Sequence, residues 1–463
     1  MKKLALLAVA LLVGMGVFPL RPALQPSQAQ DPVEITMVHI FPSEDDVRVD
    51  TLEALATAFE AETGVRVNLQ STTDDYQEVF NNALNAAEQG EAPQVVQVED
   101  TLVQLAIDSQ LFVKIGDLAT EEQLATIPDL LPAVRNYYNL DVEIWGMPWN
   151  ASNPIMYYNP TIFEAAGLDP NTPPTTFDEL LASCEAIMAA NVDGLQACVN
   201  FPVTSWIVEQ WVSMQGDLLV NNENGRGAER PTEVLLTDES VVRIFDWWKT
   251  LDDAGYFTYS GTPAAYTPEG ITFINRQTAI HISTSAALSN IFNFAPILGR
   301  FTPMVAPLPK PTAEADNGVT VGGGSLWVLD DGTHTDEEIR AAIDWIFFLT
   351  NTENDKAWHK ASGYFPIRQS SVEALTAEGW FEENPAFLIP CCNSTRMTLM
   401  QPTAVLAWAR MARCVIPWWP PFNPSLTRAS RLKMRWRLPR CRRMPLLPNT
   451  TPSSASRCAL WPK

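Results

Sequence analysis

The 463-residue sequence is poor in the residue patterns that mark membrane channels, metal sites and common enzymes. Beyond its first twenty residues it has no apolar run of the roughly 20 residues that a membrane-spanning helix needs. It has four histidines and no CxxC or HxxH spacing, so no metal site is indicated. It also lacks the GxSxG, HExxH and GxxxxGK[ST] motifs of serine hydrolases, zinc proteases and nucleotide-binding enzymes. Catalysis is therefore not indicated, and no cofactor is expected.

Basic residues are scarce in most of the chain and acidic residues are missing from its end. The net charge is −23, with 54 acidic residues against 31 basic ones, which disfavours a nucleic-acid binder. All the acids precede residue 391, whereas residues 391–463 hold 13 bases. We expect this anomalous basic tail to result from a frameshift in the gene. The alternative is a basic arm that docks on anionic membranes or nucleic acid.

The N-terminal segment has the features of an export signal. Two lysines precede the apolar run 4–20, and small residues at Ser27 and Ala29 fit a cleavage site. We expect residues 1–29 to be a cleaved signal peptide, the alternative being an uncleaved anchor. Both place the body of the protein in the periplasm or outside the cell. No cysteine lies near the cleavage site, so a lipid anchor is not expected.

Strand and helix patterns alternate in the first part of the body. β-rich runs at 33–39, 65–69 and 94–98 alternate with helical stripes at 49–59 and 76–84. Such alternation predicts a parallel sheet covered by helices on both faces. Ligands bind outside the carboxyl ends of the strands in these sheets, which directs attention to Glu99 and Asp100.

The same alternation restarts after Trp149. We predict the elements in the following order: a strand at 154–158, a short helix at 163–167, a helix opened by a capping box at Thr176–Glu179, a helix with the stripe Val241, Ile244, Phe245 and Trp248, a strand at 325–329 and a helix at 337–349.

About 430 mature residues suit two domains rather than one core. We therefore predict an α/β fold of two doubly wound lobes joined by hinge crossings. Lobe 1 takes residues 30–147 and 302–354, and lobe 2 takes residues 148–301 and 355–390.

The aromatic residues fit either sugar binding or core packing. The 15 tryptophans include Trp149, Trp206, Trp211 and the pair Trp247-Trp248. Indole rings stack on sugars, but they also fill cores. Neighbouring carboxylates such as Asp330-Asp331 leave a secreted glycoside hydrolase as a remote alternative.

Two further motifs can each be interpreted in two ways. The run Gly322-Gly323-Gly324 can form an anion-binding nest of N–H groups or a bulge at a strand start. Cys184 and Cys198 can form a disulfide, worth roughly 3 kcal/mol for a loop of about 15 residues, or remain buried thiols.

Several segments together resemble one protein family. The segments GGGSLW at 322–327 and WHKASGYFPI at 358–367 resemble paired motifs of the substrate-binding protein of glycerol-3-phosphate ABC importers. Further similar segments are PWNASNP at 148–154, YYN at 157–159, GLDP at 167–170 with PP at 173–174, and AALSNI at 286–291. The resemblance covers about residues 33–390. It implies a type II periplasmic-binding-protein fold, a monomer, and a membrane permease as partner.

The resemblance also implies a set of ligand-binding residues in the cleft between the lobes: Tyr76, Asp100 where the family has Glu, Ser152, Thr284 where the family has Ser, Gly323 and Tyr364. Their hydroxyl donors, backbone N–H and carboxylate acceptor suit a polyol phosphate. The expected ligand is sn-glycerol-3-phosphate or a glycerophosphodiester. The alternative is a mono- or oligosaccharide carried by a sugar importer.

The sequence departs from the family pattern in two places. The family ends its first strand in Trp-His, whereas this chain has Val38-His39. The family also places an arginine from its C-terminal region against the ligand phosphate, and here that region is the anomalous tail. An arginine suits this role because its planar fork binds two oxygens at once. No arginine of the tail can be assigned to it.

Overall fold

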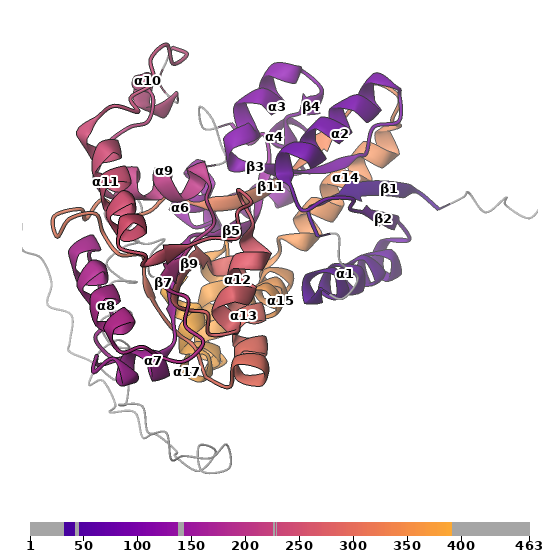
Figure 1. Ribbon diagram of the computed structural model, residues 1–463. Coiled ribbons are helices and arrows are strands. Elements are labelled where there is room, and N and C mark those ends of the chain that lie inside the picture. Colours follow the sequence, from indigo (N-terminus) through magenta and orange to yellow (C-terminus); the bar gives the residue numbers. More distant parts are fainter. Residues whose placement is uncertain (1–31, 42–45, 138–142, 226, 228, 391–463) are drawn as a thin grey trace, which may run out of the picture. The chain divides into compact units, whose positions relative to one another are not determined.

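The computed structural model describes residues 32–41, 46–137, 143–225, 227 and 229–390 (Figure 1). These residues all belong to the first of two units, Met1–Ile416 and Pro417–Lys463. The signal segment 1–29 and the tail 391–463 lie outside the described residues. The expectations of a cleaved signal and of a frameshift therefore stay predictions.

The first sheet combines parallel and antiparallel strands. Its strand order is β2 (Arg66–Gln70), β1 (Glu34–Val38), β3 (Val95–Glu99), β11 (Gly322–Leu329) and β4 (Phe112–Val113), with β5 (Met147–Ser152) also paired to β11. Strands β1, β2 and β3 run parallel, as predicted. Strand β11 runs antiparallel to β3, β4 and β5, so the sheet is mixed rather than wholly parallel.

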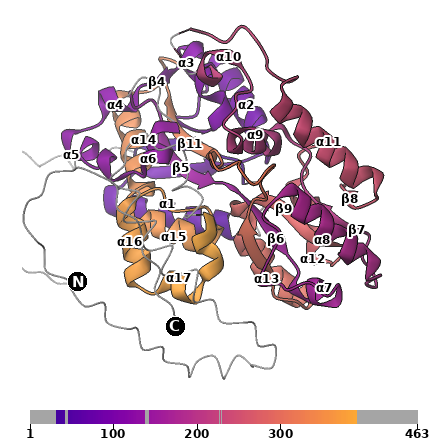
Figure 2. The ribbon, with the colours of Figure 1, turned by 90° about the vertical axis from the view of Figure 1, so that its left-hand side faces the viewer.

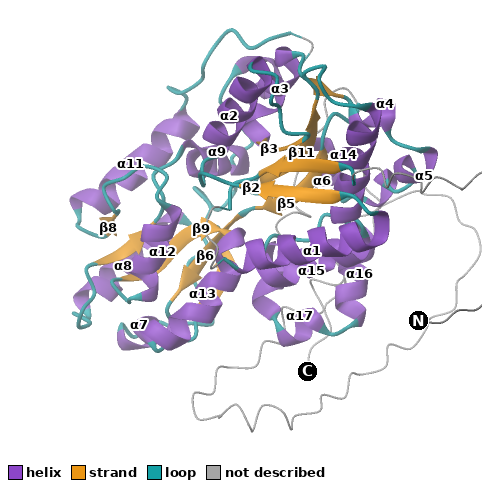
Figure 3. Cartoon of the chain, turned by 90° about the vertical axis from the view of Figure 1, so that its right-hand side faces the viewer, coloured by secondary structure: helices purple, strands orange, loops and turns teal. Residues whose placement is uncertain are grey.

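The second sheet has the strand order β10 (Met304–Pro307), β6 (Pro154–Tyr158), β9 (Thr278–Thr284), β7 (Ala197–Asn200) and β8 (Phe257–Thr258). This sheet, whose strands β6, β8 and β9 are labelled in Figure 3, is also mixed, because β6 runs antiparallel to β9 and β10 whereas β7 runs parallel to β8 and β9. Strand β5 thus belongs to the first sheet and β10 to the second, although the predicted lobe boundaries assign each to the other lobe. The division into lobes otherwise stays a prediction.

Helices flank both sheets and fill the rest of the described chain. The α-helices are α1 (Val47–Thr63), α2 (Tyr76–Glu88), α3 (Val103–Ser109), α4 (Ile115–Leu118), α5 (Glu121–Leu124), α6 (Pro132–Tyr137), α7 (Pro160–Ala165), α8 (Phe177–Ala189), α9 (Ser205–Met214), α10 (Asn221–Asn224), α11 (Glu239–Asp253), α12 (Tyr266–Ile274), α13 (Leu288–Phe294), α14 (Asp336–Leu349), α15 (Thr352–Ser362), α16 (Gln369–Ala377) and α17 (Trp380–Glu383). Helices α15, α16 and α17 lie side by side near the end of the described chain (Figure 2).

Helix α1 shows how the sequence pattern produces a first-sheet helix. Leu52, Leu55 and Phe59 recur at helical spacing and are buried, as the stripe predicts. Gly64 ends the helix with φ +77°, a left-handed conformation that glycine adopts without steric cost. The helix packs against β2 and α15.

Helix α11 buries only part of the predicted stripe. Val241, Ile244 and Trp247 are buried, whereas Phe245 is half exposed and stacks on Trp248. Apolar residues cover two adjacent faces of this helix, so periodicity alone could not select the buried one.

The predicted capping box at the start of α8 forms with one of its two hydrogen bonds displaced by one residue. Thr176 accepts from the backbone N–H of Glu179 as expected, but the Glu179 carboxylate accepts from the N–H of Thr175. The reciprocal bond therefore goes to the residue before the N-cap.

A disulfide joins Cys184 of α8 to Cys198 of β7, with the two Cα atoms 5.2 Å apart. Both residues are fully buried. The structure thus selects the disulfide over the alternative of two free thiols, and the bond holds α8 against the second sheet.

Within the described ranges, no helix is both long and apolar enough to cross a membrane. The same residues contain no cluster of three or more His, Cys, Asp or Glu side chains that could hold a metal ion.

Candidate functional site

The two sheets meet where β5 leaves the first sheet and β6 enters the second. Only Asn153 separates the two strands. Ser152 at the end of β5 lies opposite Gly322 of β11, and Pro154 at the start of β6 lies opposite Thr284 of β9. We call residues 150–154, 284–285 and 322–324 the junction. Three of the six predicted ligand-binding residues, Ser152, Thr284 and Gly323, belong to it.

The glycine run allows four elements to approach one another at the junction. A Cβ on Gly322 would lie 2.5 Å from Nε1 of Trp206, and one on Gly323 would lie 2.0 Å from the Asn150 carbonyl oxygen. A Cβ on Gly324 would lie 3.0 Å from Cε1 of Tyr76. Gly323 has φ +100°, and the β5–β11 pairing shifts register after Gly324. The register shift fits the bulge interpretation, and the absence of side chains on the glycines provides room for neighbouring groups.

A chain of side-chain hydrogen bonds links Tyr76 to the strand ends of the first sheet. Asn150 donates from Nδ2 to the Tyr76 hydroxyl at 2.6 Å and accepts at Oδ1 from Gln97 at 2.9 Å. Gln97 in turn accepts from the Ile40 N–H at 2.9 Å, just after β1. Because Asn150 and Gln97 are fully buried, these bonds position the phenol firmly. Neither residue was predicted from the sequence, although each is a polar residue within a buried strand.

Ser152 ends β5 in the first sheet, and Thr284 ends β9, which pairs with β6 in the second sheet. Ser152 is buried, and it is the last residue of β5 in the first sheet rather than a residue of the second. The Thr284 hydroxyl accepts from the Ala286 N–H, and its carbonyl accepts from the Tyr157 hydroxyl at 2.8 Å. The backbone N–H of Ser285 donates to the carbonyl of Asn153 at 2.9 Å. Strand pairing thus brings the backbones of Ser152 and Thr284 to the two ends of the Asn153 crossing.

Tyr364 reaches the same region from the end of α15. Gly363 ends that helix in a left-handed conformation, and a Cβ there would lie 2.8 Å from Leu288. The Tyr364 ring stacks on Trp358 with centroids 6.1 Å apart and contacts Phe41 at 6.5 Å. The next residue, Phe365, donates its N–H to the carbonyl of Ala151 on β5 at 2.9 Å. This bond holds the chain next to Tyr364 against Ala151, the residue that precedes Ser152.

Two carboxylates add negative charge beside the junction. Glu99 ends β3, opposite Gly324 of β11, and Glu209 lies on α9 one turn after Trp206. Burial raises the pKa of Glu99, and the negative charges of Glu209 and Asp75 raise it further. Burial likewise raises the pKa of Glu209. Both groups are placed to accept hydrogen bonds from hydroxyl groups.

Asp100 follows Glu99 directly and begins a 3-10 helix, Asp100–Leu102, so its backbone lies at the predicted strand end. Its side chain is outside the described residues. Its ligand-binding role stays a prediction.

Arg48 is a cation near this site that the sequence analysis did not identify. It is the second residue of α1, and its guanidinium carbon lies 4.6 Å from the centre of the Phe41 ring. Asp46 accepts from its Nε at 2.9 Å and forms an ion pair with Nη2. Burial tends to lower the pKa of Arg48, but Asp46, Tyr364 and Tyr76 together raise it above its usual value.

The tryptophans mostly serve the core. Trp149 and Trp211 are buried, and Trp247 stacks on Phe177 with centroids 3.8 Å apart. Trp206 differs, because it is only partly buried and its ring lies against Gly322 at the junction. It is the one of these rings whose position fits contact with a ligand.

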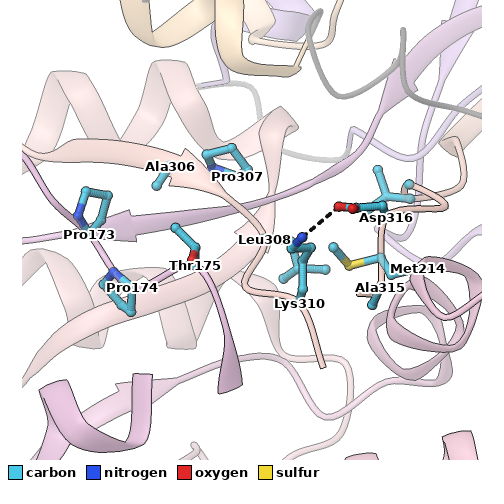
Figure 4. A pocket seen from close by; sticks show the side chains of 12 residues that line it. Pro173, Pro174, Thr175, Met214, Ala306, Pro307, Leu308, Lys310, Ala315 and Asp316 are labelled. Carbon is cyan, nitrogen blue, oxygen red and sulfur yellow. Dashed lines mark hydrogen bonds and ion pairs between the residues drawn. The ribbon is translucent and has the colours of Figure 1, made fainter. Parts of the chain in front are cut away.

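A cavity of about 260 Å³ lies elsewhere in the molecule, lined by residues such as Pro173, Met214, Leu308 and Lys310 (Figure 4). The Lys310 ammonium is paired there with Asp316 at 2.6 Å. None of the six predicted ligand-binding residues lines this cavity.

Sequence comparisons agree on one family. Residues 54–389 match the profile of the family described as bacterial extracellular solute-binding protein. The sn-glycerol-3-phosphate-binding periplasmic protein UgpB of Escherichia coli is 25% identical over 409 residues, which is 87% of either chain. UgpB of Yersinia pseudotuberculosis is 25% identical over 334 residues, 71% of this chain and 72% of its own.

Solved structures of the same fold include binding proteins for different ligands. UgpB from Mycobacterium tuberculosis, in complex with glycerophosphocholine, has a TM-score of 0.65 at 19% identity and covers 83% of this chain and 91% of its own. The GacH receptor of Streptomyces glaucescens, solved unliganded and with acarbose, has a TM-score of 0.63 at 19% identity, covering 76% and 86%. These likenesses show the type II periplasmic-binding-protein fold that the sequence predicted. Because the family profile matches most of its length and the fold agrees, the chain belongs to the bacterial extracellular solute-binding proteins, the binding components of ABC importers.

Proposed function

We propose that this protein captures sn-glycerol-3-phosphate or a glycerophosphodiester at the junction and delivers it to a membrane permease. The observation that carries the proposal is the meeting of Ser152, Gly323 and Thr284 at the strand ends of both sheets. Tyr76 lies beside them through its hydrogen bond from Asn150. Hydroxyl groups and a backbone N–H are suitable donors to phosphate oxygens.

The carboxylates suit the other part of such a ligand. Glycerol carries hydroxyl groups that donate hydrogen bonds, and Glu99 and Glu209 are acceptors with limited access to water. The backbone of Asp100 starts directly after Glu99, and we propose that its carboxylate also takes part.

Binding would couple to closure of the two lobes. The strand crossings at the junction act as the hinge in this proposal, and a ligand that contacts residues of both sheets favours the closed form. The permease then recognises the closed form. The protein performs no chemistry in this mechanism.

A mono- or oligosaccharide is the second candidate ligand. The partly buried ring of Trp206 against Gly322, with Glu209 one turn along the same helix, would suit a sugar ring. Titration calorimetry of the full chain with sn-glycerol-3-phosphate, glycerophosphocholine and maltose tests the choice. We expect micromolar binding of a phosphate ligand; heat with maltose alone would reject the phosphate proposal. Turnover of a chromogenic glycoside would support the remote alternative of a hydrolase.

A further inference from the structure

We propose that Arg48, at the start of α1, supplies the cation that binds the ligand phosphate in this protein. This inference rests on the proposed function and assigns a residue to one part of the ligand. Its starting point is an electrostatic problem: Glu99 and Glu209 place negative charge beside the junction, so an anionic ligand needs a cation nearby. The described part of the chain offers Arg48.

The aromatic cluster connects Arg48 to the site. Its guanidinium lies over the Phe41 ring, whose centroid is 6.5 Å from that of Tyr364 and 6.1 Å from that of Trp149. Trp149 precedes Asn150, the residue that donates to Tyr76. The charge of Arg48 also interacts with the phenols of Tyr364 and Tyr76, which approach the junction from different elements. The Phe41 ring thus contacts both Arg48 and Tyr364, one of the six predicted ligand-binding residues.

The guanidinium retains donors for a ligand. A guanidinium carries five N–H groups. The Nε–H and one N–H of Nη2 donate to the Asp46 carboxylate. Among the described residues, no acceptor occupies Nη1. The side chain is 22% exposed, so solvent reaches part of it. A phosphate could therefore bind through Nη1 while Phe41 and Asp46 hold the fork in place.

Asp46 in this arrangement both positions and neutralises Arg48. Its side chain is 10% exposed and caps α1 by accepting from the Arg48 N–H at 2.9 Å. The same carboxylate repels an incoming phosphate. An asparagine would keep the cap, because Asn is as good an N-cap as Asp, while removing the negative charge.

Calorimetry on the full chain and three variants tests the assignment. Arg48→Gln should weaken sn-glycerol-3-phosphate binding about 10- to 100-fold, the range expected for a lost charge-assisted hydrogen bond. Glycerophosphocholine should lose less, because a phosphodiester carries one negative charge and the monoester nearly two at pH 7. The matched control is Arg66→Gln, an exposed arginine paired with Glu34 and Glu60, which should leave both affinities unchanged.

The third variant guards against a folding artefact. Asp46→Asn should tighten sn-glycerol-3-phosphate binding about threefold or more, since it removes a competing anion. A destabilised α1 would not produce tighter binding. If the unmodified chain binds phosphate ligands and Arg48→Gln binds them equally well, the assignment of Arg48 is wrong and the proposed function stands. If the unmodified chain binds no phosphate ligand, both fail together.

Discussion

Gly323 is the residue whose backbone geometry most constrains the site. Its φ is +100°, and a methyl group added to its Cα would lie 2.0 Å from the Asn150 carbonyl oxygen, so no side chain fits there. The close β5–β11 pairing beside Ser152 depends on this absence. A glycine here is therefore required for packing, whichever ligand binds.

We predict that Gly323→Ala lowers the free energy of unfolding by about 2–4 kcal/mol, because it adds a steric clash to an unfavourable φ. Gly332→Ala is the matched control: its φ is +85° but nothing lies within 4 Å of the added methyl, so about 1 kcal/mol is expected. Urea denaturation of both variants measures the difference. Equal losses would contradict the close approach at Gly323.

A second prediction at this scale concerns the Tyr76 hydroxyl. Tyr76→Phe should weaken ligand binding about tenfold, because it removes a hydroxyl held toward the junction by Asn150. The control is Tyr158→Phe. It removes a buried hydrogen bond from the hydroxyl of Tyr158, on β6, to the Pro170 carbonyl, and neither residue belongs to the junction. That variant should lose about 1 kcal/mol of stability and keep its affinity. Calorimetry that found the two affinities equal would show that Tyr76 is not a ligand contact.

At the scale of elements, local sequence patterns predicted five of the eleven strands and six of the seventeen α-helices in the described residues, but not how the strands pair. The strands at 33–39, 65–69 and 94–98 were found by their β-rich composition, and their parallel order follows from the intervening helices. Strand β11 lies beside β3 although more than 220 residues separate them, and no local pattern specifies its direction. The mixture of parallel and antiparallel strands in both sheets could therefore not be predicted from the sequence.

The candidate site likewise has residues that could be predicted from the sequence and residues that only the tertiary structure reveals. Its hydroxyl residues could be named from the family resemblance, whereas Asn150, Gln97 and Arg48 became visible only through their contacts. Buried polar side chains in apolar strands are a usable sequence signal, but their partners depend on tertiary structure.

The disulfide between α8 and β7 gives a prediction for one element pair. The double variant Cys184→Ala with Cys198→Ala should lower the unfolding free energy by roughly 3 kcal/mol, as expected for a loop of about 15 residues. Guanidinium denaturation without reductant measures it. Adding reductant should bring the unmodified protein close to the variant, and an unchanged midpoint in both cases would argue against the bond.

At the scale of the whole molecule, buried titratable groups link stability to pH. Burial lowers the pKa of His39 and His359 to about 4 and that of His281 to about 3. Their folded pKa values lie below the unfolded value, so the unfolded chain binds more protons as the pH falls from 6.5. Burial raises the pKa of Asp355 to about 6, which offsets part of this effect.

We therefore predict that the unfolding free energy falls by about 3–5 kcal/mol between pH 7 and pH 5. Urea denaturation at the two pH values checks this. His359→Gln should remove about 2 kcal/mol of this change, because one buried neutral imidazole with an unfolded pKa of 6.5 contributes roughly that much between pH 7 and pH 5. A stability that is equal at both pH values would mean that these histidines are not buried in the neutral form.

The central claim is that the ligand binds at the junction of the two sheets. A crystal structure of the full chain with sn-glycerol-3-phosphate tests it most directly. We predict ligand density in contact with Tyr76, Ser152, Thr284, Gly323 and Tyr364, with a phosphate oxygen about 2.8 Å from an Arg48 nitrogen. Density in the cavity beside Lys310, with the junction unoccupied, would contradict the account.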